Sequence, residues 1–224
     1  MTVDTGKPLA ALRDSSGFAI LLSNGVAIAV AMLQNWDLRP LMALYWCQSV
    51  IIGGFNFLRM MRLRQFTTQG MTSNDEPVPE TAEGKRSTAI FFAIHYGFFH
   101  LGYLVFISIM SFDDQSDSTF DGPWEPTGYD WLWLLVGVVS FLAGHWYSFR
   151  KNVVADLAGR PNLGTMMFLP YARIIPMHLT IIFGFWMGSN RGALLLFMLL
   201  KTAADFLMHV VEHRIMQKSA AGAA

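Results

Sequence analysis

The stretch that decides the fold is AIFFAIHYGFFHLGYLVFISIMSF, residues 89–112. It contains no Asp, Glu, Lys or Arg, and it has the length of roughly 17–25 mostly apolar residues that a helix needs to cross a bilayer. Five further apolar runs of comparable length flank it in the chain. They are residues 17–33, 40–60, 131–149, 166–188 and 192–211. The sequence therefore predicts an all-α, polytopic integral membrane protein with six transmembrane helices.

The overall composition agrees with a membrane protein and excludes several other classes. Of the 224 residues, 53% are hydrophobic and 14% are charged, against roughly 25% charged residues in a typical soluble domain. The mean hydropathy is positive, at +0.37. Sixteen Lys and Arg balance sixteen Asp and Glu, so there is no basic excess of the kind that binds nucleic acid. The single cysteine, Cys47, cannot build a disulfide scaffold.

The distribution of Lys and Arg predicts the orientation, because cytoplasmic loops carry an excess of these residues. Twelve of them lie on one side of the six runs, and two lie on the other side. The twelve are Lys7, Arg13, Arg59, Arg62, Arg64, Lys85, Arg86, Arg150, Lys151, Arg160, Arg214 and Lys218; the two are Arg39 and Arg191. We therefore expect both termini in the cytoplasm.

The connecting segments suggest a single membrane domain over residues 1–218. Residues 65–87 contain the polar sequence TSNDEPVPETAEGK, which is typical of a flexible cytoplasmic loop. Residues 113–130 hold six acidic and no basic residues, and we expect them to form a solvated acidic outer loop. The Ala-rich tail 219–224 is expected to be disordered. We interpret residues 17–33 as a retained helix, since this run is long for the apolar core of a signal peptide.

Two further features bear on packing. The pair Gly53-Gly54 is expected to allow a neighbouring helix to approach closely. Pro176 frees a backbone carbonyl and is expected to kink the fifth span beside His178.

Polar side chains within the apolar runs are candidate functional residues, because an ionisable group at membrane depth is costly. With a rise of about 1.5 Å per residue, they fall into two levels of the inner half of the bilayer. The shallow level holds His95, Arg173, Asp205 and His209, and the deep level holds His100, His178 and Lys201. We expect these side chains to converge on one polar cavity.

The last span carries the most regular of these patterns. Lys201, Asp205, His209 and His213 are spaced by four, so they lie on one helix face. Lys201 and Asp205 could form an ion pair within the helix. Asp205 could instead pair with Arg173, which would leave Lys201 to meet a substrate anion.

The leading hypothesis is a metal site with a catalytic role. Imidazole nitrogen and carboxylate oxygen are ligands that zinc prefers, and a bound metal in a dry cavity can activate water for hydrolysis of a lipid-like substrate. The candidate ligands are His95, His100, His178, Asp205 and His209. Arg173 and Lys201 would bind an anionic head group or tune Asp205, so Asp205, Lys201 and Arg173 are the candidate catalytic residues. Bis-histidine haem on His100 and His178 is a further alternative.

Asp205, His209 and His213, spaced by four on one helix face, resemble the arrangement of metal-binding residues in intramembrane zinc hydrolases of the ceramidase and adiponectin-receptor type. Those families have seven helices and additional acidic and serine motifs that this sequence does not display. This departure leaves the hydrolase activity in doubt.

A broader resemblance covers most of the chain. The stretches YWCQSVIIGGFNFLRM (45–60), FFAIHYGFFHLGYLVF (91–106) and ALLLFMLLKTAADFLMHVVEH (193–213) resemble one family of bacterial and archaeal polytopic membrane proteins, a domain of unknown function. The resemblance implies a prokaryotic plasma-membrane protein and implies no activity.

Two rival functions use the same residues. A small ion- or proton-coupled transporter would employ them as a proton relay, and an accessory membrane subunit would use them to join helices. The bilayer is the expected partner, a homodimer is compatible with the sequence, and nucleic acid is not expected. Substrate, metal identity and oligomeric state are not encoded in any pattern found.

Overall fold

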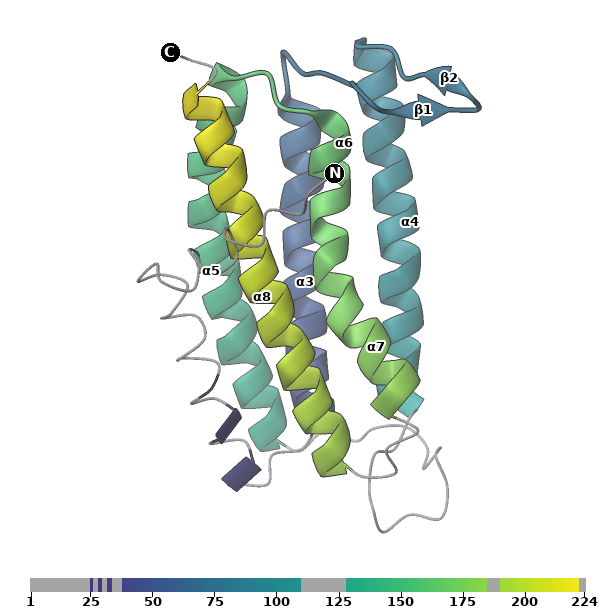
Figure 1. The fold of residues 1–224 in the computed structure, drawn as a ribbon. Helices are drawn as coiled ribbons and strands as arrows, with labels where there is room; N and C mark the ends of the chain where they lie inside the picture. The colour runs from purple at the N-terminus through teal and green to yellow at the C-terminus, as the bar shows by residue number, and fades with distance from the viewer. Residues whose placement is uncertain are drawn as a thin grey trace, which may run out of the picture. The chain divides into compact units, whose positions relative to one another are not determined.

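The described part of the chain is almost entirely helical (Figure 1). The computed structural model describes residues 38–109, 128–184 and 190–221, with isolated positions 25, 28, 29, 32 and 33, and omits the side chains of 128–130, 133, 173, 184, 190 and 208–221. The elements are α3 (Leu38–Arg62), β1 (Thr72–Ser73), β2 (Glu76–Pro77), α4 (Ala82–Ile109), α5 (Gly128–Ala158), α6 (Leu163–Phe168), the 3-10 helix η1 (Leu169–Arg173), α7 (Ile174–Gly184) and α8 (Asn190–Ala221). Most of the predicted outer loop 113–130 and most of the predicted helix 17–33 lie outside the described residues, and the tail 219–224 is described only to Ala221, the last residue of α8.

The chain divides into two compact units, which are treated separately. The first, called the α3–α5 unit, comprises residues 39–111 and 116–174 and holds α3, the hairpin, α4, α5, α6 and η1. The second, called the α7–α8 unit, holds α7 from residue 175 and α8.

Three helical segments in the described residues are long and apolar enough to cross a membrane. They are Leu38–Arg62, Ala82–Ile109 and Leu163–Phe183. They overlap the predicted second, third and fifth spans. On α4 the outward face carries large apolar side chains, and Phe98 is 72% exposed and Ile94 69% exposed. Such a surface is unfavourable in water and favourable against lipid, so these helices have the character of membrane spans.

The helices extend beyond the apolar runs from which they were predicted. α4 begins at Ala82 rather than Ala89, because Thr81 caps it: the Thr81 hydroxyl accepts a hydrogen bond from the Gly84 amide at 3.2 Å. α5 continues past Phe149 to Ala158 through a polar stretch. A capped polar turn contributes nothing to a hydropathy window, so the apolar pattern alone missed these turns.

The fifth predicted span is interrupted, and the interruption lies at Pro170 rather than Pro176. Pro170 stands in the first turn of η1, which separates α6 from α7. Pro176 lies in the first turn of α7, where a missing amide costs little. The Pro176 carbonyl accepts a hydrogen bond from the Thr180 hydroxyl at 2.8 Å.

The segment between α3 and α4 forms a hairpin and a bridge, which differs from the flexible loop expected for residues 65–87. Asn74 and Asp75 both have positive φ, 52° and 64°, as a two-residue hairpin turn requires. Thr67 pairs with Asn162: the Thr67 amide donates to the Pro161 carbonyl at 3.0 Å, and the Leu163 amide donates to the Thr67 carbonyl at 2.9 Å. We call this part of the α3–α5 unit its loop end.

Side-chain bonds hold the loop end together. Arg160 forms an ion pair with Glu80 and donates to the Phe66 carbonyl at 3.2 Å. The Lys85 ammonium donates to the Leu63 carbonyl at 2.7 Å, which ties the start of α4 to the end of α3. Hydrogen bonds from the Thr67 hydroxyl and the Thr68 amide, with the Arg160 charge, lower the pKa of Glu80.

α3 and α4 approach closely at Gly53. A Cβ atom at this position would overlap the Tyr96 ring, coming within 2.9 Å of its Cδ1 atom, whereas a Cβ atom at Gly54 would meet nothing within 4 Å. The expectation that the glycine pair permits close packing therefore applies to Gly53, and Gly54 is exposed.

We predict that Gly53→Ala destabilises the protein by about 1–3 kcal/mol, because the added methyl group must displace the buried Tyr96 ring. The melting temperature of the detergent-solubilised protein measures this effect. Gly54→Ala adds the same methyl group to the neighbouring residue and should be neutral or slightly stabilising. Equal effects of the two substitutions would contradict the α3–α4 packing.

We also predict a pH-dependent contribution from Glu80. Because the folded-state pKa is lowered, the carboxylate stabilises the fold above its unperturbed pKa near 4.5, and this stabilisation is lost as the pH falls through the depressed value. At neutral pH, Glu80→Gln should therefore melt at a lower temperature than the wild type, and the difference should vanish on acidification. Glu76→Gln in the exposed hairpin is the control and should show no such trend.

Candidate functional site

The side chains predicted to converge are divided between the two units. His95 and His100 lie on α4 in the α3–α5 unit, whereas His178 on α7 and Lys201 and Asp205 on α8 lie in the α7–α8 unit. The side chains of Arg173 and His209 lie outside the described residues. Each unit is therefore described by the contacts within it.

His100 belongs to a cluster of polar and aromatic side chains between α3 and α4. We call this set, consisting of Trp46, Ser49, Tyr96, His100 and Tyr103, the α3–α4 polar cluster. The Ser49 and Tyr96 hydroxyls are 2.7 Å apart, and the Tyr96 hydroxyl is also 3.0 Å from the Ser49 carbonyl. The Trp46 indole donates to the His100 carbonyl at 2.8 Å. These bonds satisfy the Ser49 and Tyr96 hydroxyls and the Trp46 indole N–H, and they fix the helix register.

The protonation pattern of His100 follows from its partner. The imidazole Nδ1 lies 2.8 Å from the Tyr96 carbonyl oxygen, which can only accept a hydrogen bond, so Nδ1 must carry a proton. In the neutral ring, Nε2 then presents a lone pair. The side chain is only 3% exposed, and Nε2 has no hydrogen-bond partner among the described residues. Tyr96 stacks on the ring with a centroid distance of 4.2 Å, so the imidazole is held in a defined orientation.

His95 points away from this cluster. Residues five apart on a helix are separated by about 140° around the axis, so His95 and His100 cannot share a face. His95 is exposed, stacks on Phe91 at 5.3 Å between ring centroids, and has Nδ1 2.8 Å from the Tyr171 hydroxyl of η1. The two imidazoles of α4 therefore lie on different sides of the helix, and the ligand set that contains both stays a prediction.

In the α7–α8 unit, Lys201 and Asp205 form the ion pair that their spacing allows. The Lys201 ammonium lies 2.7 Å from the Asp205 carboxylate, and the two side chains are 30% and 22% exposed. The pair interrupts the apolar sequence of α8 with two charges that neutralise each other. His178 on α7 is exposed.

Within the described ranges, no three His, Cys, Asp or Glu side chains lie close enough together to hold a metal ion. The side chain of His209 lies outside the described residues, so the ligand set that includes His209 stays a prediction. Among the described residues of the α3–α5 unit, His95 and His100 are linked only indirectly, because Tyr171, which contacts His95, packs against the Tyr96 ring that stacks on His100.

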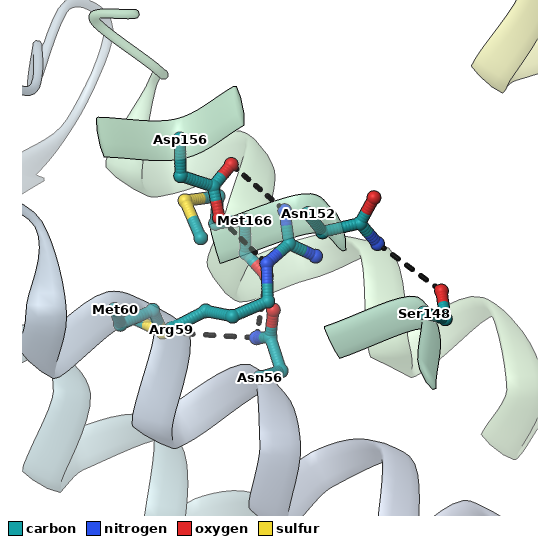
Figure 2. A network of polar contacts seen from close by, with 7 residues as sticks. All are labelled: Asn56, Arg59, Met60, Ser148, Asn152, Asp156 and Met166. Atoms are coloured by element: carbon teal, nitrogen blue, oxygen red, sulfur yellow. Dashed lines mark hydrogen bonds and ion pairs between the residues drawn. The ribbon is translucent and has the colours of Figure 1, made fainter. Parts of the chain in front are cut away.

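A second polar network, which the sequence analysis did not identify, lies near the loop end (Figure 2). The Arg59 guanidinium binds both oxygens of the Asp156 carboxylate, with Nε–Oδ2 at 2.7 Å and Nη2–Oδ1 at 2.9 Å. Beside it, the buried Asn56 amide donates to the Met166 carbonyl at 2.8 Å. We call these contacts the Arg59 network. They join α3 to α5 and to α6.

A sequence signal for this network exists but is weak. Asp156 is the single acidic residue in the polar C-terminal part of α5, and Arg59 stands near the end of α3. In the sequence, Arg59 is one of the Lys and Arg residues that indicate the cytoplasmic side, and no local pattern links it to the distant Asp156.

We predict that Asp156→Asn destabilises the protein, because the substitution leaves the half-buried Arg59 charge without a counter-charge. The expected loss is roughly 1–3 kcal/mol, which lies between the values typical of exposed and of buried ion pairs. The exchanged double variant Arg59→Asp/Asp156→Arg should recover part of this loss. The measurement is the melting temperature of the wild type, of Asp156→Asn, of the exchanged double variant and of its two single variants, Arg59→Asp and Asp156→Arg. No recovery, together with an additive double-mutant cycle, would show that the pair contributes no coupling.

Comparison with known proteins identifies the family of the chain. No curated protein and no solved structure matched it, so no named relative supports the likeness to ceramidase-type hydrolases. The model of a family of unknown function, DUF6498, matches residues 7–222. This match covers nearly the whole sequence and agrees with the resemblance of the three apolar stretches, and the chain therefore belongs to the DUF6498 family.

Proposed function

We propose that the protein is a multi-pass membrane carrier with six spans and both termini in the cytoplasm of a prokaryotic cell. Three described helices with the length and composition of membrane spans support the membrane location. The excess of twelve Lys and Arg over two supports the orientation. In this arrangement the loop end of the α3–α5 unit faces the cytoplasm.

The observation that carries the transport function is the Lys201–Asp205 ion pair within the apolar sequence of α8. Separating charged groups from water is costly, so membrane spans rarely keep them without a functional reason. A single turn of helix brings the two charges together, and the pair is electrically neutral as a unit. Such a unit can stay in a membrane span and still exchange one partner for another ion.

The chemistry of the pair explains how it couples to a cation. A proton or a metal cation that binds the Asp205 carboxylate competes with the Lys201 ammonium for the same oxygens. When Asp205 is neutralised, Lys201 loses this counter-charge, which favours binding of an anion or release of the Lys201 proton. Occupancy of Asp205 and the state of Lys201 are therefore linked, which is the requirement for coupled transport.

A second candidate function is metal binding, with zinc or another divalent metal as cofactor and hydrolysis of a lipid-like substrate as the extended hypothesis. The observation that favours it is the buried Nε2 lone pair of His100. Metal-ligating histidines usually donate their other ring N–H to a backbone carbonyl or a carboxylate, as His100 does to Tyr96. Bis-histidine haem, with His100 and His178 as candidate ligands, would use the same Nε2 lone pair of His100.

The test is ion flux in proteoliposomes that contain a pH-sensitive dye, with the full-length protein. We predict a pH-dependent flux in the wild type that Asp205→Asn abolishes and Lys201→Met strongly reduces, because either change removes one half of the coupled pair. Asn and Met approximate the sizes of the residues that they replace. Thr202→Val, one residue after Lys201 on the same helix, is the control and should retain the flux.

Elemental analysis of the same purified proteins separates the two functions. Stoichiometric metal that is lost in His100→Ala, together with the absence of flux, would overturn the carrier proposal in favour of metal binding. Absence of both flux and metal in a folded wild-type protein would contradict both candidate functions and favour the accessory-subunit hypothesis.

A further inference from the structure

The last turns of α5 present an exposed polar surface that the proposed function does not use. Tyr147 is 74% exposed, and Ser148, Arg150 and Lys151 are also exposed. With about 100° per residue, Tyr147, Ser148, Arg150 and Lys151 fall on one side of the helix within about two turns. We call these four residues the α5 cationic face.

Within the described part of the chain, no acidic side chain pairs with the charges of this face. Arg150 and Lys151 have no acidic partner among the described residues. Asp156, the one acid in the same part of α5, binds Arg59 instead, and Figure 2 shows its carboxylate turned toward the Arg59 guanidinium. Asp156 lies about 120–140° around the helix from Arg150 and Lys151, and its charge is paired with Arg59, so it does not balance the two cations of the face.

The position of the face along α5 matches the border between hydrocarbon and headgroups. The outward side of the preceding turns is apolar, with Leu135 62% exposed and Val139 56% exposed. Trp146, 51% exposed, follows, and Trp and Tyr are enriched at membrane interfaces. With a rise of about 1.5 Å per residue, Lys151 lies roughly 18 Å along the helix from Val139. The first exposed cations of α5 thus come directly after its interfacial aromatic residues.

A further cation contacts α5 on the side of the helix opposite this face. The exposed Arg62 at the end of α3 places its guanidinium 5.0 Å from the centre of the Phe149 ring, which is buried behind the α5 cationic face. Phe149 in turn stacks against Trp146 at 5.8 Å. The ring contact restricts where the Arg62 charge can go, and it holds this charge close to α5.

We propose that the α5 cationic face binds the headgroup of an anionic phospholipid. The lipid phosphate accepts hydrogen bonds from Arg150 and Lys151, the Tyr147 and Ser148 hydroxyls donate to phosphate or glycerol oxygens, and Trp146 packs along the upper acyl chain. Charge complementarity selects an anionic headgroup over a zwitterionic one, because Arg150 and Lys151 lie here without an acidic partner among the described residues. In the proposed orientation this lipid belongs to the inner leaflet, but the binding itself does not require the carrier function.

The test measures retained lipid by native mass spectrometry of the full-length protein after exchange into mixtures of phosphatidylglycerol and phosphatidylcholine. The wild type should retain phosphatidylglycerol preferentially. Arg150→Gln/Lys151→Gln should weaken this binding roughly twentyfold, as expected for loss of two interfacial cations. Arg64→Gln/Arg86→Gln removes the same charge from other exposed positions of the loop end and is the matched control, which should retain the preference.

Three outcomes would overturn the proposal. Equal loss of phosphatidylglycerol from both double variants would mean that general surface charge, and not this face, attracts the lipid. A wild type without preference between the two lipids would mean that the cations face only solvent. Inorganic phosphate that displaces phosphatidylglycerol completely would mean that the face binds a free anion. The melting temperature of each variant without added lipid confirms that the comparison is made between folded proteins.

Discussion

The α3–α5 unit depends on one kind of interaction. Helix α3 carries polar side chains in an apolar environment, and each of them must pair with a polar group of a neighbouring helix. Water is absent from a bilayer core, so a polar group there must find its partner within the protein. α3 meets this constraint at two levels, with Ser49 bonded to Tyr96 of α4 and Arg59 bonded to Asp156 of α5. Each pairing is satisfied in only one register of the helices. The polar groups therefore select one helix register, whereas purely apolar side chains would allow several registers of similar free energy.

The two polar regions have different chemical consequences. The Arg59 network is fully paired and lies near the loop end, where its effect is to hold α3, α5 and α6 together and to withdraw the Asp156 charge from the surface. The α3–α4 polar cluster leaves one strong acceptor, Nε2 of His100, without a partner among the described residues. A satisfied network stabilises the fold, whereas an unsatisfied buried acceptor costs free energy.

The sequence predicted much of the helical structure and little of the contact pattern. Apolar runs located α3, α4 and the α6–α7 segment, because the length of an apolar run is a local property. The same measure missed the capped turn at Thr81 and the polar extension of α5. The i, i+4 spacing correctly suggested the Lys201–Asp205 pair, since both partners lie on one helix. It could not show that His95 contacts Tyr171 and that Arg59 contacts Asp156, because those partners come from distant segments.

By itself, the sequence determined that this chain is a helical protein with membrane-type spans, that it carries an asymmetric distribution of Lys and Arg, and that it belongs to its family. These properties reside in composition and local order, which the chain has before it folds. Only the tertiary structure decided which polar side chains meet, which proton His100 keeps, and which cations remain without an acid. Those outcomes depend on the rotation of each helix about its axis, and packing against other helices sets that rotation.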